Sequence, residues 1–109
     1  MEKEMFNNLI KDLQNKYQEI NITGKWDVKR GAGLILTQRK NKYNQPPVIF
    51  RNCTVMINDN NEFEFYNNYG ESVVIDEMIQ ESIEMLKQDI LKKAKKRMKK
   101  KEEVKSWVS

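Results

Sequence analysis

One long amphipathic helix, expected over residues 72–101, constrains this chain more than any other feature. Apolar residues recur there every three or four positions, as on a single helical face. They are Ile75, Ile79, Ile83, Leu86, Ile90 and Ala94. The polar face is acidic at first and purely basic at the end. A helix of about thirty residues spans roughly 45 Å, more than a small domain needs. We therefore expect its basic end to project from a compact body.

The basic end places eight cations in ten residues. They are Lys92, Lys93, Lys95, Lys96, Arg97, Lys99, Lys100 and Lys101. The net charge of the whole chain is +4, so this run of +8 leaves −4 on the rest. Such a concentration of positive charge suits a phosphate backbone. Two alternatives stay open, since bases near a helix C-terminus also complement the helix dipole, and the run can be a solvated tail.

The remaining periodicities predict an α+β fold in the order α-β-β-β-β-α. Helical spacing predicts a first helix over residues 2–18, and alternation predicts strands over 20–28, 34–38, 48–57 and 62–65. The short connections favour a four-stranded antiparallel sheet, flanked by the N-terminal helix and the long C-terminal helix on one side. We expect a single domain over residues 1–109, in which 92–109 form a basic helical extension and tail.

The same patterns predict the core and two local features. Gly24 interrupts a strand and suggests a bulge or bend, and Ser72 is expected to cap the long helix. The predicted core residues are Phe6, Leu9, Leu13, Ile22, Val28, Leu34, Leu36, Val55, Ile57, Phe63, Phe65, Ile79, Ile83, Leu86 and Ile90.

A second candidate surface is the loop after the second strand. Two prolines and several amides over residues 39–47 cannot continue a central strand. Its candidate binding residues are Arg39, Lys40, Lys42 and Tyr43. An aromatic ring among cations can stack on a base while the cations hold phosphates. An exposed loop without a function is the alternative.

Composition argues against catalysis. The chain has no histidine, and its one cysteine, Cys53, falls on an alternating strand where a small buried apolar residue is expected. We predict no enzyme activity, no cofactor and no metal site. Because no stretch of eighteen apolar residues and no apolar leader is present, we expect a cytoplasmic protein without membrane contact.

Two short resemblances bear on function. The segments 8–16 and 20–24, with Asn58 to Glu62 and the helix after Glu71, resemble small type II-A anti-CRISPR proteins of Gram-positive phages. Those inhibitors are acidic DNA mimics, whereas this chain ends strongly basic. Residues 22–24 and 31–34 and the closing charged helix are similar to the YbaB nucleoid-associated family, which implies a DNA-binding dimer. Heavy use of Lys, Asn and Ile is also typical of an AT-rich genome.

We therefore predict a small binding protein of phage or mobile-element type. It would engage nucleic acid or a nucleic-acid-handling enzyme complex, as an anti-CRISPR-like modulator. The alternatives are a dimeric nucleoid-associated DNA-binding protein and a protein-binding inhibitor without nucleic-acid contact. The exposed part of the helix, with Met98 and Trp107, predicts weak self-association.

Overall fold

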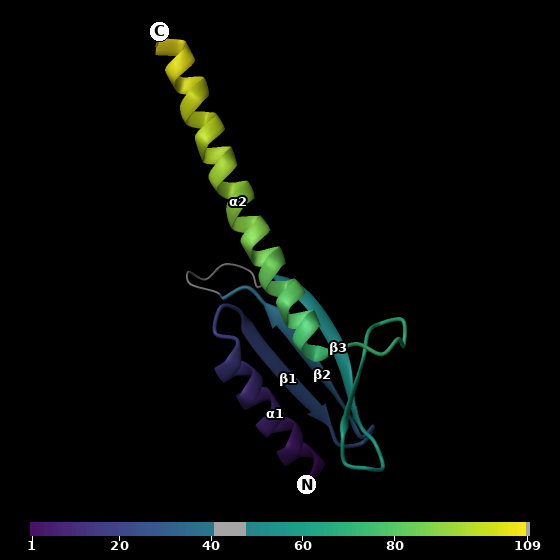
Figure 1. Ribbon diagram of the computed structural model, residues 1–109. Helices are drawn as coiled ribbons and strands as arrows, with labels where there is room; N and C mark the ends of the chain where they lie inside the picture. Colours follow the sequence, from purple (N-terminus) through teal and green to yellow (C-terminus); the bar gives the residue numbers. More distant parts are fainter. Residues whose placement is uncertain (41–47, 109) are drawn as a thin grey trace.

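The computed structural model describes the backbone of residues 1–40 and 48–108, and the side chains of these residues as far as Lys95. The chain forms α1 (Glu2–Lys16), β1 (Asn21–Asp27), β2 (Ala32–Gln38), β3 (Ile49–Ile57), β4 (Phe63–Tyr66) and α2 (Ile75–Val108). The strands pair as an antiparallel meander in the order β1-β2-β3-β4 (Figure 1). The predicted α+β fold is thus confirmed.

Both helices cover the same face of the sheet. Phe6 of α1 lies against Gly33 of β2, and Ser82 of α2 contacts Thr37 of the same strand. Gly33 and Thr37 share one face because strand side chains alternate with a period of two. The core lies between this face and the helices, around the fully buried Phe6, Ile35 and Ile79. Within residues 1–40 and 48–108, no helix covers the opposite face of the sheet, which we call the bare face.

Of the predicted core residues, three are exposed and one is only half-buried outside the core. Val28 is 71% exposed beyond the end of β1, Leu34 is 44% exposed on the bare face, and Leu36 beside it is only half-buried. Ile90 is 58% exposed because α2 has left the body by that point. The prediction that Leu34 and Leu36 of β2 face the core is therefore wrong, because Ile35 between them is the residue that points inward.

The two predicted local features are also corrected. β1 pairs with β2 in unbroken register through Gly24, so no bulge occurs there. A Cβ at Gly24 would lie 2.5 Å from Ile10, so the glycine permits the close approach of α1. Ser72 does not cap α2. It forms an isolated bridge with Tyr66, and α2 begins three residues later.

A β-bulge occurs instead at the start of β3. Thr37 pairs with Arg51 and Gln38 with Ile49, so Phe50 is the extra residue. Phe50 packs against the core as a half-buried residue. None of the helices in the described residues is long and apolar enough to cross a membrane.

Candidate nucleic-acid interface

The basic residues lie on the part of α2 that extends beyond the body. Ile83 is buried at 6% exposure, whereas Ile90 and Leu91 are 58% and 52% exposed. From Ile90 onward the helix continues away from the sheet (Figure 1). Its 34 residues correspond to about 51 Å. The predicted projecting helix is therefore present in the backbone.

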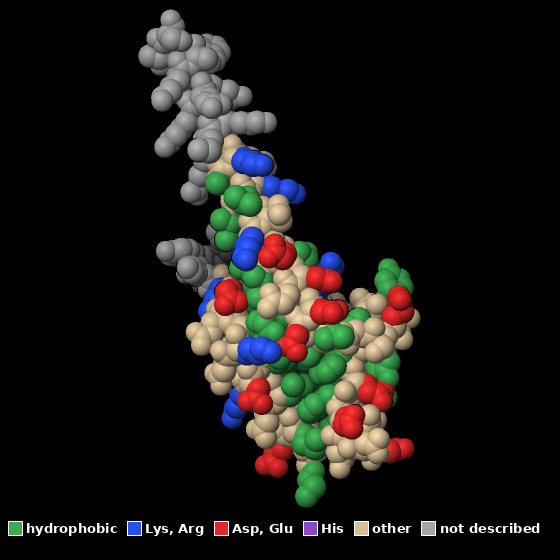
Figure 2. Space-filling model, viewed as in Figure 1, with side chains coloured by type: hydrophobic (Ala, Val, Ile, Leu, Met, Phe, Trp, Pro, Cys, Tyr) green, Lys and Arg blue, Asp and Glu red, His purple; other side chains and the backbone are tan. Residues whose placement is uncertain are grey.

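Three of the eight predicted cations have described side chains. Lys92, Lys93 and Lys95 are all exposed on the projecting helix. In Figure 2, Lys and Arg side chains occupy this part of α2, and acidic side chains cluster over the body below it. Neither Lys92 nor Lys95 has a carboxylate within ion-pair distance among the residues with described side chains. Within the described side chains, their positive charge is therefore not neutralised.

The remaining five cations lie on the helical backbone of α2, and their side chains lie outside the described residues. These are Lys96, Arg97, Lys99, Lys100 and Lys101. Their sequence places them immediately after Lys95, on the same continuous helix.

The structure brings the two candidate basic segments together at one point. Asp89 Oδ2 lies 3.7 Å from an Arg39 guanidinium nitrogen and 3.7 Å from Lys93 Nζ. Arg39 directly follows β2, and its N–H donates to the Val48 carbonyl at 2.9 Å, which closes the base of the loop. Two cations thus surround one carboxylate where α2 leaves the body. Sequence periodicity alone did not reveal this junction.

The loop residues are only partly placed. Lys40 is exposed next to Arg39, whereas Lys42 and Tyr43 lie outside the described residues. Arg39 itself is half-buried, with its side chain 21% exposed. It holds the loop base to α2 rather than offering a fully exposed charge.

The acidic half of α2 is bound into the body by pairs with basic residues. Asp76 pairs with Lys16 at 3.0 Å, and Glu81 with Arg51 at 3.6 Å. The Tyr17 hydroxyl also donates to Asp76, which joins the end of α1 to the start of α2. These contacts join the first turns of α2 to α1 and to β3, next to the buried apolar face of the helix around Ile79.

Cys53 is fully buried, as its strand position predicted. Burial raises the pKa of the Cys53 thiol to about 12. A thiol with such a pKa stays protonated near neutral pH and is a poor nucleophile or metal ligand.

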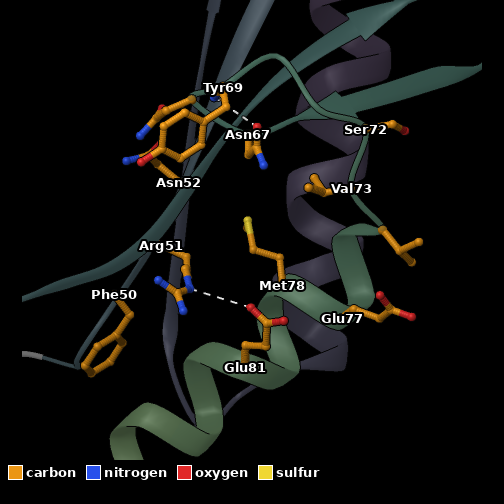
Figure 3. Close-up of a pocket in the computed structure, with 12 residues that line it drawn as sticks. Phe50, Arg51, Asn52, Asn67, Tyr69, Ser72, Val73, Glu77, Met78 and Glu81 are labelled. Carbon is orange, nitrogen blue, oxygen red and sulfur yellow. Dashed lines mark hydrogen bonds and ion pairs between the residues drawn. The ribbon is translucent and has the colours of Figure 1, made fainter.

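The prediction from sequence missed a cavity of about 570 Å³ between β3, the β4–α2 connection and the first turns of α2. Figure 3 shows Arg51, Met78 and Glu81 around it, with Tyr69 at its margin. The cavity depends on the shortness of β4 and on the path of residues 67–74. The sequence does predict a short last strand, over residues 62–65, but the path of residues 67–74 has no local sequence signal.

No protein-family model, curated protein or solved structure matches the chain. The resemblances to anti-CRISPR proteins and to the YbaB family therefore stay predictions.

Proposed function

We propose that this protein is a non-enzymatic nucleic-acid-binding protein that contacts the phosphate backbone through the basic end of α2. The carrying observation is the extension of α2 beyond the body, with exposed Lys92 and Lys95 that no described carboxylate neutralises. Phosphates bound by such cations release condensed counterions, and this release drives association.

Lysine side chains hold phosphates without distinguishing bases, so the proposed binding is largely independent of sequence. The ion pair between Arg39 and Asp89 places the base of the loop beside the start of the projecting helix. The exposed Lys40, next to Arg39, can therefore extend the contact surface from the helix to the loop. In a phage or mobile element, such a surface suits a modulator of a nucleic-acid-handling complex. A basic end argues for contact with the nucleic acid rather than imitation of it.

The direct test removes the charge at the end of α2 and compares an equal removal elsewhere. The variant replaces Lys95, Lys96, Lys99 and Lys100 by glutamine. The control replaces the exposed Lys3, Lys11, Lys25 and Lys29 by glutamine, which gives the same net charge. Fluorescence anisotropy then measures binding to two labelled duplexes of unrelated sequence.

We expect the helix variant to lose affinity by roughly 10- to 100-fold at low salt, equally on both duplexes. The control should stay within about threefold of the wild type, because surface charges remote from the interface act weakly. Equal losses in both variants would show that net charge, not the helix, governs binding.

A second candidate function, protein binding without nucleic acid, is favoured by the bare face of the sheet. Leu34 and Met56 are 44% and 45% exposed there, on adjacent strands. Exposed apolar side chains on one face are typical of a protein contact. Under this alternative Leu34→Asp would abolish binding of a protein partner, and the fourfold helix variant would retain it.

A further inference from the structure

The outer edge of β3 is only partly covered. β3 runs from Ile49 to Ile57, but β4 pairs only with Thr54–Ile57. Among the residues that the structure describes, no strand pairs with Ile49–Cys53 on that side. An uncovered strand edge is a template for another extended chain.

The backbone of Asn52 faces this uncovered edge. The neighbouring Arg51 directs both its polar groups toward β2, since its N–H donates to Thr37 Oγ1 at 3.0 Å and its carbonyl accepts from the same hydroxyl at 3.3 Å. Successive residues of a strand present these groups to opposite sides. The N–H and carbonyl of Asn52, which pairs regularly with Leu36, therefore point toward the cavity.

The opposite walls of the cavity are apolar and acidic. Val73 and Met78 line its floor, and Val74 is 55% exposed beside them. Glu77 and Glu81 of α2 both line the cavity. In Figure 3 the Glu81 carboxylate turns toward Arg51, whereas Glu77 lies at the outer rim and points away from Arg51. Glu81 already pairs with Arg51, whereas Glu77 has no ion pair within the described part of the chain. Glu77 is thus available to a cation from outside.

The connection from β4 to α2 is fixed in place by its own hydrogen bonds. Asn67 Oδ1 accepts the N–H groups of Tyr69 and Glu71 at 2.9 and 3.0 Å. The N–H of Val73 donates to the Phe65 carbonyl at 2.9 Å. The wall of the cavity is therefore preformed, and a ligand need not order it.

We propose that this cavity, the β3-edge groove, binds an extended segment of a partner protein that carries a lysine or arginine. The segment adds to β3 at Asn52 as a further strand, in line with the end of β4. On its helix-facing side an apolar side chain packs on Val73 and Val74. A basic side chain two positions away meets Glu77. The groove holds two carboxylates and one cation, Arg51, which already pairs with Glu81. The remaining negative charge favours a basic peptide over a phosphate, so the occupant is a protein even if the end of α2 binds DNA.

A random heptapeptide library displayed on phage, panned against the full chain, tests this proposal. We expect enriched peptides to carry a Lys or Arg two positions from a β-branched or apolar residue. A synthetic enriched peptide should lose about three- to fivefold in affinity for Glu77→Gln, because Glu77 is exposed and its ion pair is screened by solvent. The control Glu84→Gln, exposed on the same helix and paired with Lys87 outside the groove, should change it less than about twofold.

A separate experiment tests whether the peptide pairs with the edge of β3 as a strand. Methylating the backbone nitrogens of the peptide removes its strand donors without altering its charge, and should abolish binding. In NMR titrations of the wild type, the Asn52 amide should shift on binding. The proposal is overturned if no peptide is enriched, if enriched peptides lack a basic residue, or if Glu77→Gln leaves their affinity unchanged. A perturbation confined to Leu34 and Met56 would equally contradict it and assign the binding to the bare face of the sheet.

Discussion

At the scale of single residues, one buried pair of polar side chains lies within the apolar core. Thr37 and Ser82 are both fully buried, and their hydroxyl oxygens lie 2.7 Å apart between β2 and α2. The Ser82 hydroxyl also donates to the Met78 carbonyl at 2.9 Å. Within the described part of the chain no buried side-chain nitrogen or oxygen lacks a hydrogen-bond partner. A buried threonine is therefore compatible with an otherwise apolar interface.

The first prediction is that Thr37→Val lowers the free energy of unfolding by about 1–3 kcal/mol, because it leaves the Arg51 N–H without its acceptor. Urea unfolding measures the change. Thr54→Val, a half-buried site on the bare face, should alter stability by less than about 0.5 kcal/mol. Equal stability of the two variants would contradict the role assigned to Thr37.

The second prediction concerns pH and Asp76. Hydrogen bonding from Tyr17, and next from Lys16, lowers the pKa of Asp76 below its ordinary 3.8. The ionised carboxylate therefore stabilises the fold above pH 3.8, and this contribution is lost as the pH falls through the lowered pKa. Since Asp76 is half exposed, solvent screens part of the effect.

Unfolding free energies measured from pH 7 down to pH 2 check this prediction. The stability difference between wild type and Asp76→Asn should shrink below about pH 4. Tyr17→Phe should reduce the same pH dependence, since it removes the main donor to Asp76. A difference that stays constant over the whole range would show that the contact does not involve the charged carboxylate.

At the scale of elements, the sequence predicted α2 well and β2 poorly. The spacing of Ile75, Ile79 and Ile83 matches their burial, because one helical face meets one sheet. In β2, Leu34, Ile35 and Leu36 are all apolar, so alternation could not decide which face points inward. The neighbouring Thr37 makes the inward face still harder to predict, because a polar residue is expected to face solvent. Its burial is favourable only because it hydrogen-bonds to Ser82 of α2, which is distant in sequence.

The third prediction separates the packed and projecting parts of α2. Ile79→Ala should destabilise the fold by about 2–5 kcal/mol, as truncations of fully buried residues do. Ile90→Ala, at an exposed site on the same helix, should cost less than about 1 kcal/mol. Chemical denaturation of both variants checks this. Equal losses would show that the apolar surface near Ile90 is covered in solution, as weak self-association through the projecting helix requires.

At the scale of the whole molecule, the basic charge lies on the projecting helix and the acidic charge on the compact body. The molecule measures 70 × 27 × 23 Å, and the long dimension is due to α2 (Figure 1). The sequence predicted this separation because the apolar stripe weakens where the basic run begins. It could not predict that Arg39 and Lys93 share Asp89, or that a groove forms beside β3. Both depend on contacts between residues distant in sequence.

The salt dependence of binding to duplex DNA tests the central proposal most directly. If the end of α2 engages about five or six phosphates, log affinity should fall against log salt with a slope of roughly −5. The fourfold glutamine variant of Lys95, Lys96, Lys99 and Lys100 should have a slope shallower by about one unit per lost contact. Its fold should remain intact, since the apolar face that packs on the sheet is unchanged. A flat titration of the wild type, or no binding even at low salt, would contradict nucleic-acid binding by this helix.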